Sequence, residues 1–76
     1  MTADNYVMAI PYHRVDIPWF NALTHRFFIE GYLDLGEYIR VMYQVKSEYD
    51  LITNTRYFHF DSKADAVAFI LRASLL

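Results

Sequence analysis

The stretch that decides the fold runs from Thr55 to Leu76, TRYFHFDSKADAVAFILRASLL. Its aromatic run, YFHF, consists of residue types that favour strands, and side chains alternate between the two faces of a strand. Phe58 and Phe60 are therefore predicted to point to one face of a sheet. Tyr57 and His59 are predicted to point to the other face.

A helix is predicted directly after this strand. Ser62 is a good N-cap residue, and Asp65 three positions later makes a shortened variant of the capping box. The acidic charge of Asp65 also lies in the first turn, where the helix dipole favours it. The helix is thus predicted to begin at Ser62 or Lys63.

This helix carries apolar residues on more than one side. At 100° per residue, Leu71 and Leu75 lie on the flank between the core-facing stripe and the polar sector. Either another element of the domain covers that flank, or it is a surface for a partner. The core-facing stripe itself comprises Ala66, Phe69, Ile70 and Ala73, with Val67 beside it.

Two elements are predicted near the N-terminus. Residues 5–13 alternate as a strand. Pro11 has no N–H to donate, so this strand is predicted to lie at an edge of the sheet or to finish near Ile10. Asp16-Ile17-Pro18 predicts the start of a helix whose core side holds Trp19, Phe20, Leu23 and Phe27, with Arg26 facing away. Gly31 is the predicted stop, so this helix ends between Ile29 and Leu33.

The middle of the chain shows the most regular alternation. Residues 38–46 have a period of two and predict a second strand, with Tyr38, Arg40 and Met42 on one face. Residues 47–54 are polar and turn-prone, so they are predicted to connect this strand to the last one.

The fold class predicted from these elements is a compact α+β domain of order β-α-β-β-α. Its three-stranded antiparallel sheet has the last strand in the middle and two helices on one face, a split β-α-β, ferredoxin-like arrangement. The alternative places the first two strands side by side. With 76 residues, the whole chain (1–76) is predicted to be a single domain.

Composition points to a protein interface. The chain is 55% hydrophobic and 18% aromatic, with seven Tyr and six Phe, and so small a domain cannot bury every ring. A formal net charge of −2 gives no attraction to nucleic-acid backbones. The absence of cysteine, of a signal peptide and of a long apolar run predicts a protein of the cytoplasm that does not enter a membrane.

No catalytic, cofactor-binding or metal-binding residue is predicted. His13, His25 and His59 have no motif around them, although His13 and His59 meet on the uncovered sheet face if their strands pair. Ser62 is explained by capping, and no glycine-rich phosphate loop occurs. The chain is therefore predicted not to be an enzyme.

Two protein-binding surfaces are predicted instead. The uncovered sheet face is predicted to display Tyr57 and His59 together with Tyr38, Arg40 and Met42, a mixture typical of interfaces. The second surface is the flank of the last helix, with Leu71, Leu75 and Leu76.

The residues YFHF (57–60) and DAVAFILR (65–72) resemble the C-terminal strand and helix of many small uncharacterised proteins of tailed bacteriophages. In those proteins an aromatic strand is followed by an acidic residue, Ala and a Phe-x-Leu-Arg ending. The resemblance implies a phage protein of the host cytoplasm that binds and inhibits or redirects a host bacterial protein, in host takeover or anti-defence. The alternatives are a self-associating structural module, such as a homodimer, and a single-stranded nucleic-acid binder.

Overall fold

The computed structural model describes residues 5–12 and 16–75. In this part of the chain, three strands and three helices follow one another in the order β-α-α-β-β-α. They are β1 (Tyr6–Pro11), α1 (Pro18–Glu30), α2 (Leu35–Tyr43), β2 (Lys46–Asp50), β3 (Thr55–Phe60) and α3 (Lys63–Ser74).

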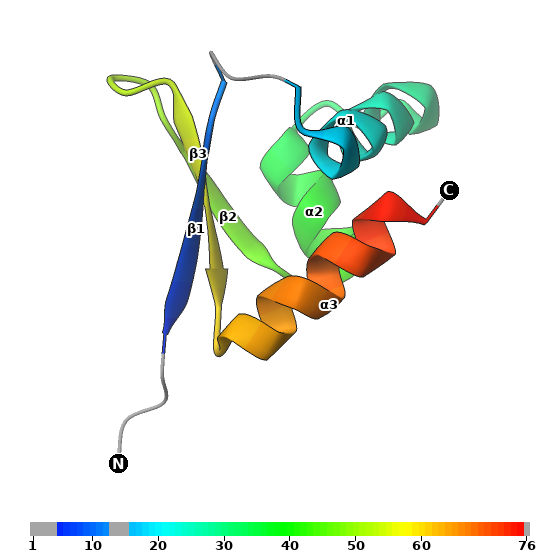
Figure 1. Cartoon of the computed structure of the whole chain (residues 1–76). Coiled ribbons are helices and arrows are strands. Elements are labelled where there is room, and N and C mark those ends of the chain that lie inside the picture. The colour runs from blue at the N-terminus through cyan, green and yellow to red at the C-terminus, as the bar shows by residue number, and fades with distance from the viewer. Residues whose placement is uncertain (1–4, 13–15, 76) are drawn as a thin grey trace.

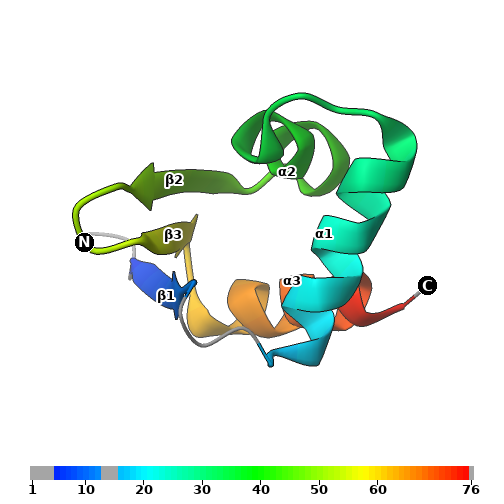
Figure 2. The same ribbon diagram turned by 90° about the horizontal axis from the view of Figure 1, so that it is seen from above.

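The strands form one open sheet in the order β1-β3-β2, and both pairings are antiparallel. The last strand thus lies between the other two, as predicted, and the alternative with the first two strands adjacent is wrong. All three helices lie on the same face of the sheet (Figure 1). Seen from above, α2 lies beside β2 and α3 lies on the β1 side (Figure 2). No described element covers the opposite face, which we call the open face.

The strand and helix predicted for the C-terminal part are confirmed. Phe58 is fully buried and Phe60 nearly so, whereas Tyr57 is only half-buried on the open face. The Ser62 Oγ accepts a hydrogen bond from the Asp65 backbone N–H at 3.2 Å, so α3 begins with the predicted cap. The alternation of β3 is therefore followed directly by a capped helix.

β1 is an edge strand, as Pro11 predicted. Its side chains alternate as expected, with Ile10 buried under the helices and Val7 and Ala9 exposed on the open face. The observed strand is shorter than the predicted 5–13, and its predicted last residue, His13, lies outside the described residues.

The second predicted strand is wrong. Residues 35–43 form the helix α2, and the strand β2 follows at 46–50, largely within the segment 47–54 that was predicted to be a connection. The Asp34 carboxylate caps this helix by accepting from the Glu37 N–H at 3.2 Å, and Gln44 ends it in the left-handed conformation at φ 60°. Consequently residues 16–75 contain three helices, and the fold is not the simple split β-α-β arrangement with two helices that was predicted.

α1 ends where the sequence predicts and begins slightly later. Its first residue is Pro18, and Ile17 occupies the N-cap position without a side-chain hydrogen bond, so Asp16 does not cap it. Gly31 stops the helix in the left-handed region, at φ 78°. A residue without Cβ adopts that conformation at low cost, which explains the glycine.

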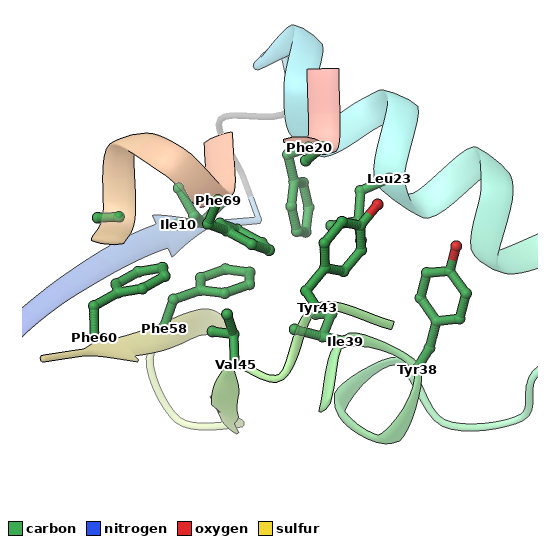
Figure 3. Close-up of a cluster of buried hydrophobic side chains, with 12 residues drawn as sticks. Ile10, Phe20, Leu23, Tyr38, Ile39, Tyr43, Val45, Phe58, Phe60 and Phe69 are labelled. Atoms are coloured by element: carbon green, nitrogen blue, oxygen red, sulfur yellow. The ribbon is translucent and has the colours of Figure 1, made fainter. Parts of the chain in front are cut away.

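Aromatic rings from the sheet and the helices meet in the core (Figure 3). The Phe69 ring lies 5.4 Å from that of Phe58 and 5.5 Å from that of Phe60, between centroids. Trp19 of α1 packs edge-on against Phe69 at 5.4 Å. The core thus joins β3, α3 and α1. Its buried apolar members are Ile10, Phe20, Leu23, Tyr38, Ile39, Tyr43, Val45, Phe58, Phe60, Ala66, Phe69 and Ala73.

Candidate protein-binding surface

The side of α3 that points away from the core is apolar. Its large residues, Val67, Leu71 and Leu75, are 48%, 61% and 73% exposed. They are spaced four residues apart, so they form one stripe along the helix and its C-cap. We call this stripe the outer face of α3. Leu71 and Leu75 therefore project into solvent. The sequence analysis had placed them on a flank of the helix, between the core-facing stripe and the polar sector.

Val67 is the member of this stripe that sequence reasoning missed. The sequence assigned it beside the core-facing residues, but it lies half-exposed. Its spacing of four from Leu71 was the available signal. The three side chains stay accessible, so the surface predicted at Leu71 and Leu75 is exposed and also includes Val67; whether it binds a protein stays a prediction. Leu76 lies outside the described residues.

Two arginines attach α3 to the rest of the helical layer. Arg26 of α1 donates from Nη2 to the Ala73 carbonyl at 2.8 Å, in the last turn of α3. Arg72 of α3 donates from Nη2 to the Met42 carbonyl at 3.2 Å, at the end of α2. The Tyr43 ring lies close to both guanidinium carbons, at 6.0 and 5.2 Å from its centroid. Cations near a helix C-terminus are favourable, so these contacts fix the orientation of α3.

Arg26 thereby corrects a prediction. The sequence placed it on the polar side of α1, away from the core, but its side chain is partly buried and reaches α3. A long aliphatic stem allows an arginine to cross apolar surface and still place its charge on a polar partner.

The structure does not bring the predicted sheet-face residues together. Tyr38, Arg40 and Met42 lie on α2, on the helical side of the sheet, whereas Tyr57 and His59 lie on the open face. The prediction of one composite surface fails because residues 38–43 form a helix.

Tyr38 is a core residue, with 1% of its surface exposed. Its hydroxyl donates to Glu30 Oε2 at 3.3 Å. Burial raises the pKa of this hydroxyl, and the neighbouring Glu30 carboxylate raises it further. Tyr38 is therefore not available to a partner.

Arg40 and Met42 remain on the surface of α2. Arg40 pairs with Glu37 one turn earlier, at 2.6 Å between Nη2 and Oε2, and the hydrogen bond to Glu37 raises the pKa of Arg40. Met42 is exposed, and its carbonyl receives the hydrogen bond from Arg72. Of the three predicted surface residues that lie on α2, Met42 is thus the one that forms a hydrogen bond with α3.

The open face is charged on its β2 side, whereas its β1 side displays Val7 and Ala9. His59 Nε2 lies 2.8 Å from Glu48 Oε2 on β2, and Lys46 is the cross-strand neighbour of His59. Adjacent charges of both signs give no net attraction to a phosphate backbone. Charged residues of this kind are also depleted in interface cores, so the β2 side of this face fits a protein interface less well than the outer face of α3.

A groove of about 410 Å³ opens between the end of α2, the end of β3 and α3. Its charged residues are of both signs, with Lys46 and Arg72 as cations and Asp61 and Asp65 as anions. Among residues 5–12 and 16–75, no group of three or more His, Cys, Asp or Glu side chains is placed to hold a metal ion.

Arg56 is a buried charge that sequence reasoning did not single out. It is 8% exposed, and it donates from Nε to the Tyr12 hydroxyl at 3.0 Å and from Nη1 to the Ser47 hydroxyl at 3.1 Å. The Tyr49 ring lies 5.9 Å from the guanidinium carbon. These contacts join β3 to β2 and to Tyr12, the residue directly after β1, so we interpret Arg56 as a structural residue.

None of the helices in the described ranges combines the length and hydropathy needed to cross a bilayer. Comparison of the chain with models of known protein families, with curated proteins and with solved structures found no match.

Proposed function

We propose that this chain is a non-catalytic protein-binding domain that uses the outer face of α3. In this proposal the partner is a host bacterial protein, which the chain inhibits or redirects in the host cytoplasm. The observation that carries the choice of surface is the exposure of Val67, Leu71 and Leu75 on one helical stripe. The class of partner rests on the resemblance of residues 57–60 and 65–72 to small phage proteins.

The size of these side chains supports binding. Burying a fully exposed valine or leucine contributes about 1.5–3 kcal/mol. Three such residues, each already partly covered, can therefore supply several kcal/mol of favourable free energy to an association. A stripe at spacing four on a helix is also the pattern by which amphipathic helices lie in apolar grooves of their partners.

The attachment of α3 adds a second argument. Arg26 and Arg72 connect the C-terminal half of α3 to α1 and α2, so the stripe is held in place before a partner arrives. Binding by a preorganised surface costs less conformational entropy than binding by a mobile segment.

Capture from a bacterial lysate tests the proposal. The immobilised chain is expected to retain a bacterial protein at fixed stoichiometry, and the purified protein should then bind the chain in a calorimetric titration. Leu71→Glu places a charge in the stripe and is expected to abolish both signals. Ile52→Glu is the matched control, because Ile52 is 94% exposed at the turn between β2 and β3, far along the chain from α3.

The melting temperatures of the two variants separate a loss of binding from a loss of folding. Both variants change exposed residues, so both should melt close to the parent. If Leu71→Glu folds normally and still captures the same protein with unchanged affinity, the outer face of α3 is not the contact surface and the proposal fails.

A further inference from the structure

The two edge strands of the sheet differ in how well their side chains oppose pairing with a strand of another chain. β2 carries Lys46, Glu48 and Asp50, whereas β1, with the sequence YVMAIP, has no charged side chain. Proteins commonly place charged residues on edge strands, because a free edge otherwise pairs with another strand. Among the described residues, β1 is therefore the less protected edge of this sheet, with Pro11 at its end as its one feature that opposes pairing.

The backbone of β1 is oriented for such pairing. The Tyr12 N–H donates to the Asn54 carbonyl at 2.9 Å and continues the ladder between β1 and β3. In an antiparallel ladder, alternate residues of a strand direct their backbone N–H and C=O groups to the same neighbouring strand. Tyr12, Ile10, Met8 and Tyr6 therefore direct these groups to β3. Val7 and Ala9 consequently direct their N–H and C=O groups to the free edge. Pro11 has no N–H and leaves only its carbonyl there.

We propose that β1 pairs with β1 of a second copy of this chain, across a two-fold axis at Met8. In this register Val7 lies opposite Ala9 of the partner subunit, and Ala9 lies opposite Val7 of the partner subunit. Each of these pairs exchanges both backbone hydrogen bonds. A large residue then faces a small one on the open face, and no charged side chain of β1 opposes another.

A second copy fits this edge better than an unrelated strand because the pairing closes. Two-fold pairing leaves neither β1 edge free and joins the two sheets into one six-stranded antiparallel sheet. Both outer edges of that sheet are then β2, which carries Lys46, Glu48 and Asp50. Growth beyond two chains is therefore opposed by charge, and a discrete dimer results rather than a fibre.

The dimer has a consequence for the outer face of α3. Paired residues in an antiparallel ladder point to the same face, so the axis is perpendicular to the sheet and both helical layers lie on one side. One particle then presents two copies of the stripe Val67, Leu71 and Leu75. A target with two sites would be bound with higher avidity than by a single chain.

Mass in solution tests the dimer. Light scattering and sedimentation over a range of concentrations are expected to give twice the mass of the chain. Val7→Lys combined with Ala9→Lys sets like charges opposite each other at both pairs, and it is expected to halve the mass. Val7→Lys combined with Ala9→Glu sets opposite charges there and is expected to restore the dimer. Ile52→Lys is the matched control and should remain dimeric.

Amide hydrogen exchange locates the interface. The Val7 and Ala9 amides face the free edge, so they are expected to be protected in the dimer and to lose that protection in the Lys/Lys variant. A monomeric parent at all concentrations would overturn the proposal. So would a dimer that the Lys/Lys variant leaves intact, or one in which both amides exchange rapidly.

The dimer and the proposed function fail separately. Leu71→Glu is expected to leave the mass unchanged while it removes partner capture. The Lys/Lys variant is expected to lose the dimer while a single chain still binds the purified target.

Discussion

The two faces of α3 differ in how their apolar residues are packed. The inner face buries two small residues, Ala66 and Ala73, together with Phe69. The outer face leaves Leu71 and Leu75 in solvent. Alanine lets the helix approach α1 closely enough for the Ala73 carbonyl to accept the hydrogen bond from Arg26. Packing therefore explains the small residues inside, whereas nothing in the described fold requires the large ones outside.

The largest effect is expected at Phe69, the large residue of the inner face that is almost fully buried. Phe69→Ala removes a ring that contacts Phe58, Phe60 and Trp19, and truncating a buried phenylalanine costs about 3–5 kcal/mol. Small domains have about 5–15 kcal/mol of stability in total, so this variant should be largely unfolded or melt at a much lower temperature. Urea denaturation measures the loss. A loss below about 1 kcal/mol would contradict the core described above.

An intermediate effect is expected from enlarging the inner face. Ala73→Leu inserts a side chain where α3 meets α1, and overpacking of this kind costs about 1–3 kcal/mol. Ala68→Leu is the matched control, because Ala68 is exposed and has room for the larger side chain. The difference between their denaturation midpoints isolates the cost of close packing. Equal midpoints would show that α3 does not need small residues against α1.

The smallest effect on stability is expected at the outer face. Leu71→Ala changes an exposed residue and keeps a strong helix former, so the free energy of unfolding should shift by no more than about 0.5 kcal/mol. Differential scanning calorimetry at low concentration measures the shift. A loss comparable to that of Phe69→Ala would mean that Leu71 supports the fold, and the contrast between the two faces would then disappear.

The sequence predicts β3 and α3 well because local signals and tertiary packing agree there. Alternation in YFHF gives a strand, and Ser62 with Asp65 marks the start of the helix. In residues 38–46 the signals conflict, since β-branched residues at alternate positions mimic a strand within a short helix. The overlooked signal was Asp34 followed three residues later by Glu37, which has the spacing of a capping box.

The candidate site could be predicted only in part, because its residues were assigned correctly only where the secondary structure around them was. Leu71 and Leu75 stood out because a helix of the right phase was already in place around them. Tyr38 was assigned to an exposed face because the period of two was wrong for its segment, and its burial depends on tertiary contacts with Glu30 and the core. The left-handed turn at Gln44 that separates α2 from β2 has no glycine to reveal it.

The pairing of β1 with β3 also bears on how the protein is made. Tyr6 pairs with Phe60, so β1 has no strand partner within the chain until most of the sequence has been synthesised. At roughly 5–20 residues per second, several seconds separate the synthesis of the two strands. Helices can form locally in that interval, but the sheet cannot. The native fold therefore arises after β3 has been made rather than progressively from the N-terminus, and slower translation of the intervening residues would lengthen the time during which the uncharged strand is unpaired.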